Sequence, residues 1–200
     1  MANIAITEHF FNGSKEDIEK LKGIFESFEE KHNGEPLGVL AEELGINTDG
    51  INLRGNIEEW YYDENGGTIF LLTTSAWDSC MGFFKRMNKE LFDYGLDISY
   101  RMEELGNAIF EVHDEGSFFP ERFYVSAYCE DEVESCDNDS ISGEYSTMDE
   151  VFKTWCRIIG KNAEEFGEDL TDAKKMDIIN DYEDYNGENT YFGVYEFLEV

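Results

Sequence analysis

The sequence predicts an α+β fold in which an antiparallel sheet carries helices on one face. Several stretches alternate apolar and polar residues with a period of two, whereas others repeat apolar residues every three or four positions. The period-two stretches come in pairs separated by short polar turns, of which Asn65-Gly66 is the strongest hairpin signal. The 200 residues are 41% hydrophobic and 15% aromatic, which is enough apolar area for a substantial folded core.

The first half of the chain alternates between strands and helices. Residues 3–10 read as a strand, and Ser14 is the expected N-cap of a helix whose apolar stripe runs from Ile18 to Phe28. A short helix is predicted for residues 36–44. Strands at 51–62 and 68–74 then form the hairpin across Asn65-Gly66.

A second helix and a second hairpin follow. Asp78 is the expected N-cap of a helix that ends at Gly95. Residues 96–103 and 107–113 are predicted strands joined by a turn that contains Gly106. The order strand, helix, strand, strand, helix, strand over residues 3–103 is that of the ferredoxin-like split βαβ fold.

The remainder of the chain is mixed and more acidic. A strand is predicted at 121–129, a helix between Ser146-Thr147 and Gly160, another helix near 171–182, and a final strand at 190–200. We therefore expect a ferredoxin-like α+β core at residues 1–129. Residues 130–200 form an acidic α/β extension, which we expect to pack on the same domain.

The stretch from Gly67 to Val112 carries a resemblance to a known family. It contains Thr74-Ser75-Ala76-Trp77 at the end of a strand, then a helix, then the aromatic-bearing strand residues Ile98-Ser99-Tyr100 and an acidic turn with Gly106. In these features it resembles the ferredoxin-like domain of YubB-type proteins, which are carried on plasmids and phages. The resemblance covers about residues 3–31 and 66–113. It implies the fold and a mobile-element setting, and carries over no catalytic residues.

Charge is the outlying property of the sequence. A net charge with a magnitude of about 2–8 is typical of a well-behaved small soluble domain. The sequence has 46 acidic and 15 basic residues, which gives a formal net charge of -31. Such a field repels nucleic acid and anionic membranes and attracts basic protein surfaces. We therefore expect a basic protein partner, with no direct nucleic-acid or membrane binding. The N-terminal residues show no signal-peptide pattern, so a cytoplasmic location is expected.

No motif identifies a reaction, a metal or a cofactor. The sequence lacks HExxH, GxSxG, GxGxxG and a Walker-type loop. The four cysteines form no CxxC pair, and a Cys80 nucleophile working with His113 has no support beyond the residue types. The acidic run CEDEVESCDNDS, residues 129–140, fails the EF-hand pattern because Ile141 and Ser142 fall where an oxygen ligand and glycine are needed. We predict no catalytic residue, no metal site and no cofactor.

Two acidic clusters are the candidate contacts to a basic partner. If the second cluster is helical, its carboxylates repeat every three or four residues and neighbouring ones are about 5–6 Å apart. The phosphates along one nucleic-acid strand have an axial rise of about 3.4 Å each, so the two spacings agree only loosely. The candidates in the first cluster are Glu130, Asp131, Glu132, Glu134, Asp137 and Asp139. Those in the second cluster are Glu164, Glu165, Glu168, Asp169 and Asp172.

These observations favour a non-enzymatic protein that binds a basic protein surface. The most specific version of this hypothesis is an inhibitor of the anti-CRISPR or anti-restriction type. Such an inhibitor comes from a mobile element, imitates nucleic acid and blocks a host defence nuclease. One alternative is a small-molecule or sugar-processing enzyme with a carboxylate-lined pocket. Another is a structural oligomerisation domain that exposes sheet edges. The sequence leaves the oligomeric state open.

Overall fold

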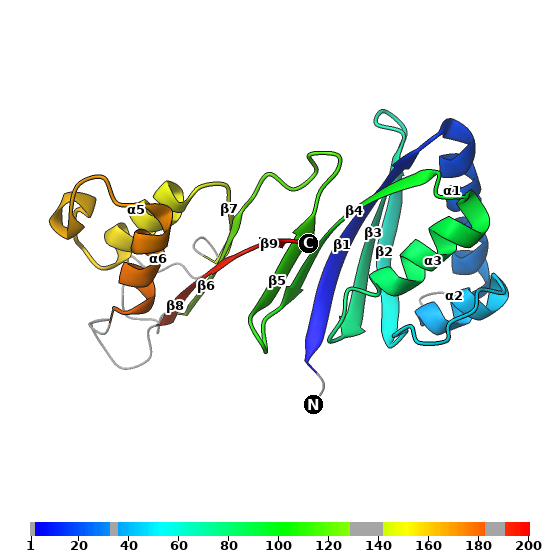
Figure 1. Ribbon diagram of the computed structural model, residues 1–200, viewed down its shortest axis with the longest axis horizontal. Coiled ribbons are helices and arrows are strands. Elements are labelled where there is room, and N and C mark those ends of the chain that lie inside the picture. Colours follow the sequence, from blue (N-terminus) through cyan, green and yellow to red (C-terminus); the bar gives the residue numbers. More distant parts are fainter. Residues whose placement is uncertain (1–2, 33–35, 129–141, 183–190) are drawn as a thin grey trace. The chain divides into compact units, whose positions relative to one another are not determined.

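The structure is a computed structural model that describes residues 3–32, 36–128, 142–182 and 191–200. It is an α+β protein rich in antiparallel strand pairs, as the sequence predicts (Figure 1). The chain forms two compact units. The first unit comprises Met1–Phe118 with Leu198–Val200, and the second unit comprises Phe119–Phe197.

A six-stranded sheet forms the first unit. Its strand order is β2-β3-β1-β4-β5-β9, and every pair is antiparallel except β5 with β9. The strands are β1 (Ile4–Gly13), β2 (Gly55–Asp63), β3 (Thr68–Ala76), β4 (Leu96–Glu104), β5 (Ile109–His113) and β9 (Leu198–Glu199). Figure 1 shows the helices on one face of this sheet: α1 (Lys15–His32), α2 (Leu37–Glu43) and α3 (Met81–Phe92).

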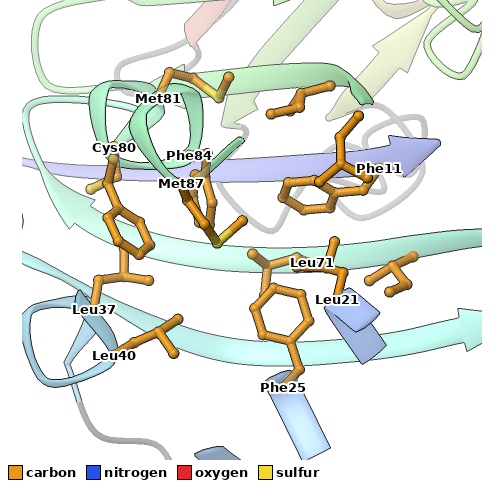
Figure 2. Packing of buried hydrophobic residues seen from close by; sticks show 14 of the residues in the cluster. Phe11, Leu21, Phe25, Leu37, Leu40, Leu71, Cys80, Met81, Phe84 and Met87 are labelled. Atoms are coloured by element: carbon orange, nitrogen blue, oxygen red, sulfur yellow. The ribbon is translucent and has the colours of Figure 1, made fainter. Parts of the chain in front are cut away.

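The core of the first unit lies between the sheet and these helices. Along β1 the side chains alternate, so that His9 and Phe11 are buried while Ile4 and Ile6 are exposed on the opposite face. The stripe predicted for the first helix is buried at Ile18, Leu21, Phe25 and Phe28. Figure 2 shows Phe11, Leu21 and Phe25 packed in one cluster with Leu71 of β3 and with Phe84 and Met87 of α3.

Local side-chain contacts determine where the helices begin. Ser14 caps α1 as predicted, because its hydroxyl oxygen accepts the Asp17 N–H at 3.1 Å and donates to the Asp17 carboxylate at 2.6 Å. Helix α3 begins at Met81, three residues after the predicted cap. Asp78 instead closes a tight turn by accepting the Cys80 N–H at 2.8 Å, and Trp77 and Cys80 have positive φ values of 67° and 57°.

The second unit has its own sheet and its own core. Strand β6 (Phe123–Tyr128) pairs antiparallel with β7 (Gly143–Tyr145) on one side and with β8 (Tyr191–Glu196) on the other. Helices α5 (Met148–Ile158) and α6 (Asp172–Asn180) and the 3₁₀ helix η1 (Ala163–Phe166) complete the described part. Trp155 of α5 is fully buried in a cluster separate from that of the first unit.

Two boundaries differ from the sequence-based expectation. We expected the strand near 121–129 to belong to the first domain, with a boundary at 129/130, but β6 forms its ladders with β7 and β8 and belongs to the second unit. We expected one final strand at 190–200. Instead, the chain leaves β8 at Phe197, and β9 pairs parallel with β5 in the first unit. No helix in the described residues is long and apolar enough to cross a membrane.

Candidate partner-binding surfaces

The structure places only the second predicted acidic cluster. The first cluster, Glu130, Asp131, Glu132, Glu134, Asp137 and Asp139, lies outside the described residues. In the second cluster, Glu164 and Glu165 belong to η1, and Glu168 and Asp169 follow it in a turn. Asp172 is the first residue of α6.

The second cluster is not one continuous helix, so its carboxylates do not have the even spacing that they would have on a helix. Helix η1 ends at Phe166 because Gly167 has a φ of 127°, and Asp169 has a left-handed φ of 54°. A new helix then begins, with the Thr171 hydroxyl accepting the Lys174 N–H at 3.3 Å. The carboxylates are therefore distributed around a turn.

A hollow of about 530 Å³ brings part of this cluster together. Glu164, Glu168 and Asp169 line it, and two cations, Lys153 and Lys175, line it as well. Glu165 has a structural use, since its carboxylate accepts the Asn162 N–H at 2.8 Å. The hollow therefore presents charges of both signs.

Internal ion pairs neutralise further carboxylates of the second unit. Lys175 Nζ lies 2.6 Å from Asp149 Oδ1, and hydrogen bonding to this ammonium, followed by its charge, lowers the pKa of Asp149. Asp172 lies 3.8 Å from Arg122 and 4.0 Å from Lys175. The described residues of the second unit contain 12 acidic and 6 basic residues, a net charge of -6.

Most of the described excess negative charge lies on the first unit. Its described residues contain 24 acidic and 9 basic residues, a net charge of -15. Part of this charge surrounds a cavity of about 280 Å³ between α1 and β2, which we call the α1/β2 cavity. Glu29, Glu58 and Glu59 line it together with Trp60.

A β-bulge explains how two successive glutamates reach this cavity. In a regular strand Glu58 and Glu59 would point to opposite faces of the sheet. The pairing of β2 with β3 shifts register between Ile57 and Glu59, which turns the strand locally. The sequence carried a signal here, since acidic and aromatic residues are adjacent at 58–62, but sequence reasoning did not select these residues as a site.

Hydrogen bonds fix two of the three carboxylates. The Trp60 indole Nε1–H donates to Glu29 Oε2 at 3.1 Å, and the Thr74 hydroxyl donates to the Glu58 carboxylate. Glu59 makes no hydrogen bond or ion pair within the described part of the chain. Because a carboxylate offers about four lone-pair sites, all three side chains keep acceptor capacity for a ligand.

The two residues considered for nucleophilic catalysis have separate surroundings. Cys80 is buried, and burial raises the pKa of its thiol to about 11, which keeps the sulfur protonated near neutral pH. His113 Nδ1 lies 2.9 Å from the Val200 carbonyl oxygen, and its Nε2 lies 3.5 Å from Glu115. Within the described residues, no hydrogen bond or ion pair joins His113 to Cys80.

Neither a search for metal-binding groups nor comparisons with known proteins identify a function. Within residues 3–32, 36–128, 142–182 and 191–200, no three His, Cys, Asp or Glu side chains gather as a metal site would require. No protein-family model, curated protein or solved structure matches the chain. The function must therefore be inferred from the charge, cavities and contacts of the chain itself.

Proposed function

We propose that this chain is a non-enzymatic acidic protein that binds a basic protein surface. In its sharpest form it is a mobile-element inhibitor that imitates nucleic acid and blocks a host defence nuclease of the anti-CRISPR or anti-restriction type. The observation that carries the proposal is a net charge of -31 on a chain with two packed cores. Disordered acidic chains lack such cores.

The strand topology supports a ferredoxin-like core as part of this proposal. After β1 and α1, the chain forms β2 and β3, then α3 and β4, and the sheet order β2-β3-β1-β4 places β3 and β4 on either side of β1. This order supports the split βαβ arrangement that we propose for the core. Kinship with the YubB-type domains, and with it the plasmid or phage setting, remains part of the proposal.

The energetics of such binding resemble those of nucleic acid. A basic groove that binds DNA or RNA gains affinity when the phosphates and its own cations release bound ions, so the affinity falls steeply with salt. Carboxylates paired with arginine forks reproduce the charge-assisted hydrogen bonds of phosphate. Glu59 of the first unit has no hydrogen bond or ion pair within the described residues, which leaves its carboxylate available for this role.

The first test is recovery of a partner from host lysate at low salt and at about 0.5 M salt. Duplex DNA or RNA is then added as a competitor, and the bound proteins are identified. The proposal predicts a nucleic-acid-binding protein that salt and competitor both displace. Recovery that neither salt nor nucleic acid changes would contradict mimicry.

A sharper test uses the purified partner. The logarithm of the association constant, plotted against the logarithm of the salt concentration, measures how many charges are paired. A variant in which Glu164, Glu168 and Asp169 become amides tests the second unit, and Glu29→Gln/Glu58→Gln/Glu59→Gln tests the first. At least one of these variants is expected to flatten the slope. Unchanged slopes in both would place the contact elsewhere.

One observation favours a second candidate function, a small-molecule or sugar-processing enzyme. The hollow of about 530 Å³ in the second unit falls in the size range of ligand pockets and is lined by several carboxylates. An enzyme would lose turnover after Glu164→Gln or Glu168→Gln alone. A mimic tolerates such single changes, because its affinity is distributed over many charges.

A further inference from the structure

The α1/β2 cavity combines an apolar aromatic floor with a carboxylate rim. Phe25 and Phe28 of α1 are buried beneath it, and the Trp60 ring lies 5.6 Å from the Phe25 ring, centroid to centroid. Glu29, Glu58 and Glu59 are exposed around this floor. No lysine, arginine or histidine is among the described residues that line the cavity.

This composition selects one kind of ligand. Aromatic rings attract a cation placed over their faces, and tryptophan does so most strongly. The carboxylates supply acceptors on the rim, where a charged head group remains partly solvated. A neutral apolar ligand would displace water from the rim carboxylates without offering them a positive charge or a hydrogen-bond donor. An anion would be repelled by them.

The same helix–strand seam already shows this mode of contact within the chain. Lys22 of α1 places its ammonium 5.0 Å from the centre of the Tyr62 ring on β2. Lys22 also lies 3.8 Å from Glu26. Two residues earlier on β2, Trp60 offers the equivalent aromatic surface with a denser set of carboxylates, and none of the described residues that line the cavity with it is a cation.

A planar guanidinium fits this cavity better than an ammonium. It can lie against the Trp60 ring while its N–H groups fork toward two carboxylate groups, whereas a lysine presents a compact, strongly hydrated charge. The bulge at Ile57/Glu59 brings Glu58 and Glu59 to one rim, where a forked donor can contact both. β2 is also an edge strand of its sheet. Within the described residues Pro36 bridges it at Asn56, and no strand pairs with this edge beyond that point, so a partner segment can approach near Trp60.

We propose that the α1/β2 cavity is the binding site for an arginine side chain of the partner protein, held between Trp60 and the carboxylates of Glu29, Glu58 and Glu59. This inference deepens the proposed function and rests on it for the identity of the ligand as part of a protein. The cavity acts as an anchor, and the remaining negative charge of the first unit attracts the basic surface around that arginine.

The test begins without a partner. The ¹⁵N-labelled full chain is titrated with Nα-acetyl-arginine amide and, separately, with the neutral isostere Nα-acetyl-citrulline amide, while the indole N–H resonances are followed. The three tryptophans provide internal references: Trp155 is buried, and the exposed Trp77 already has Arg54 over its ring at 5.1 Å. We expect a saturable shift of the Trp60 resonance, assigned with Trp60→Phe, for arginine only.

Matched variants separate the cavity from the general negative field. Glu58→Gln/Glu59→Gln removes two charges at the rim. Glu16→Gln/Glu19→Gln removes two exposed charges that lie ten or more residues before the rim residue Glu29 on α1. The first pair is expected to weaken arginine binding by about fivefold or more, and the second pair to leave it nearly unchanged. The amide spectrum of each variant shows directly whether it is folded.

Three results would overturn the inference. One is an equal response of Trp60 to citrulline, another is equal weakening by both double variants, and the third is tighter binding of Nα-acetyl-lysine amide than of the arginine probe. Failure of the proposed function looks different: the arginine probe would bind the cavity, yet no basic protein would be captured. Conversely, a basic protein could be captured with an affinity that Glu58→Gln/Glu59→Gln does not change. That result would support the proposed function and show that the α1/β2 cavity is not part of the contact.

Discussion

His9→Phe is expected to remove an acid-sensitive contribution to the stability of the first unit. His9 is fully buried on β1, with its ring 4.7 Å from that of Phe84. Its Nε2 lies 3.0 Å from Thr73 Oγ1. The Thr73 hydroxyl donates to the Thr7 carbonyl oxygen at 3.5 Å, so its oxygen accepts from the His9 Nε2–H. The Nδ1 atom has no hydrogen-bond partner in the described structure.

Burial sets the direction and size of the effect. It disfavours the imidazolium and lowers the pKa of His9 from 6.5 to about 3. Between these two values the unfolded chain binds the proton and the folded chain does not, so acid favours unfolding in this range. This contribution is small at neutral pH, reaches about 2.5 kcal/mol relative to pH 7 at about pH 4.5, and grows until pH 3.

Urea unfolding of the full chain at pH 7 and pH 4.5 measures this contribution. The carboxylates also titrate between these pH values, but they are common to wild type and variant and cancel in the comparison. Between the two pH values, His9→Phe is expected to lose about 2.5 kcal/mol less than wild type does. His113→Phe is the control, because it removes a partly exposed histidine and leaves His9 in place.

A parallel loss of stability in wild type and His9→Phe would refute this reasoning. It would mean that the imidazolium finds a partner or solvent inside the core, so that burial does not suppress its protonation. At pH 7 the variant is expected to stay within about 2 kcal/mol of wild type, because the added ring atom crowds Phe84 while the unpaired Nδ1 acceptor is removed.

Three further substitutions test contacts that define the fold, each by thermal or urea unfolding. Asn88→Ala is expected to cost about 2–3 kcal/mol, because the buried amide donates to the Leu96 carbonyl at 2.7 Å and accepts the Leu96 N–H at 3.1 Å; an unchanged midpoint would contradict this. Thr147→Ala removes the capping box of α5 and is expected to cost about 1 kcal/mol, whereas Thr147→Ser should retain most of it. Glu104→Ala leaves two backbone N–H groups of the β4–β5 turn without their carboxylate and is expected to cost about 2 kcal/mol, with Glu104→Gln in between.

Local periodicity predicted the elements well because the residues that determine them are neighbours in sequence. The apolar stripe from Ile18 to Phe28, the Ser14 cap and the β2–β3 hairpin are each specified within one short segment. The start of α3 escaped prediction because Asp78 has two possible uses, as a helix cap or as the acceptor of a tight turn. The left-handed Trp77 and Cys80 accompany the second of these.

The candidate sites were harder to predict because they depend on departures from regular structure. A positive φ at Gly167 and at Asp169 keeps the second acidic cluster from forming the single helix on which its carboxylates would be evenly spaced. A one-residue bulge brings Glu58 and Glu59 to the same cavity, although simple alternation separates them. The bulge has no signature in composition or period, whereas Gly167 is the residue type that readily adopts a positive φ.

Strand β9 also has a consequence for synthesis on the ribosome. Every residue of the hydrophobic cluster in the first unit lies between positions 11 and 100, whereas β9 follows only after Phe119–Phe197 has been made. At about 5–20 residues per second, translation of that segment takes roughly 4–16 s, long enough for many small domains to fold. The nascent first unit can therefore assemble its core and the α1/β2 cavity with one sheet edge still open, and β9 covers that edge late.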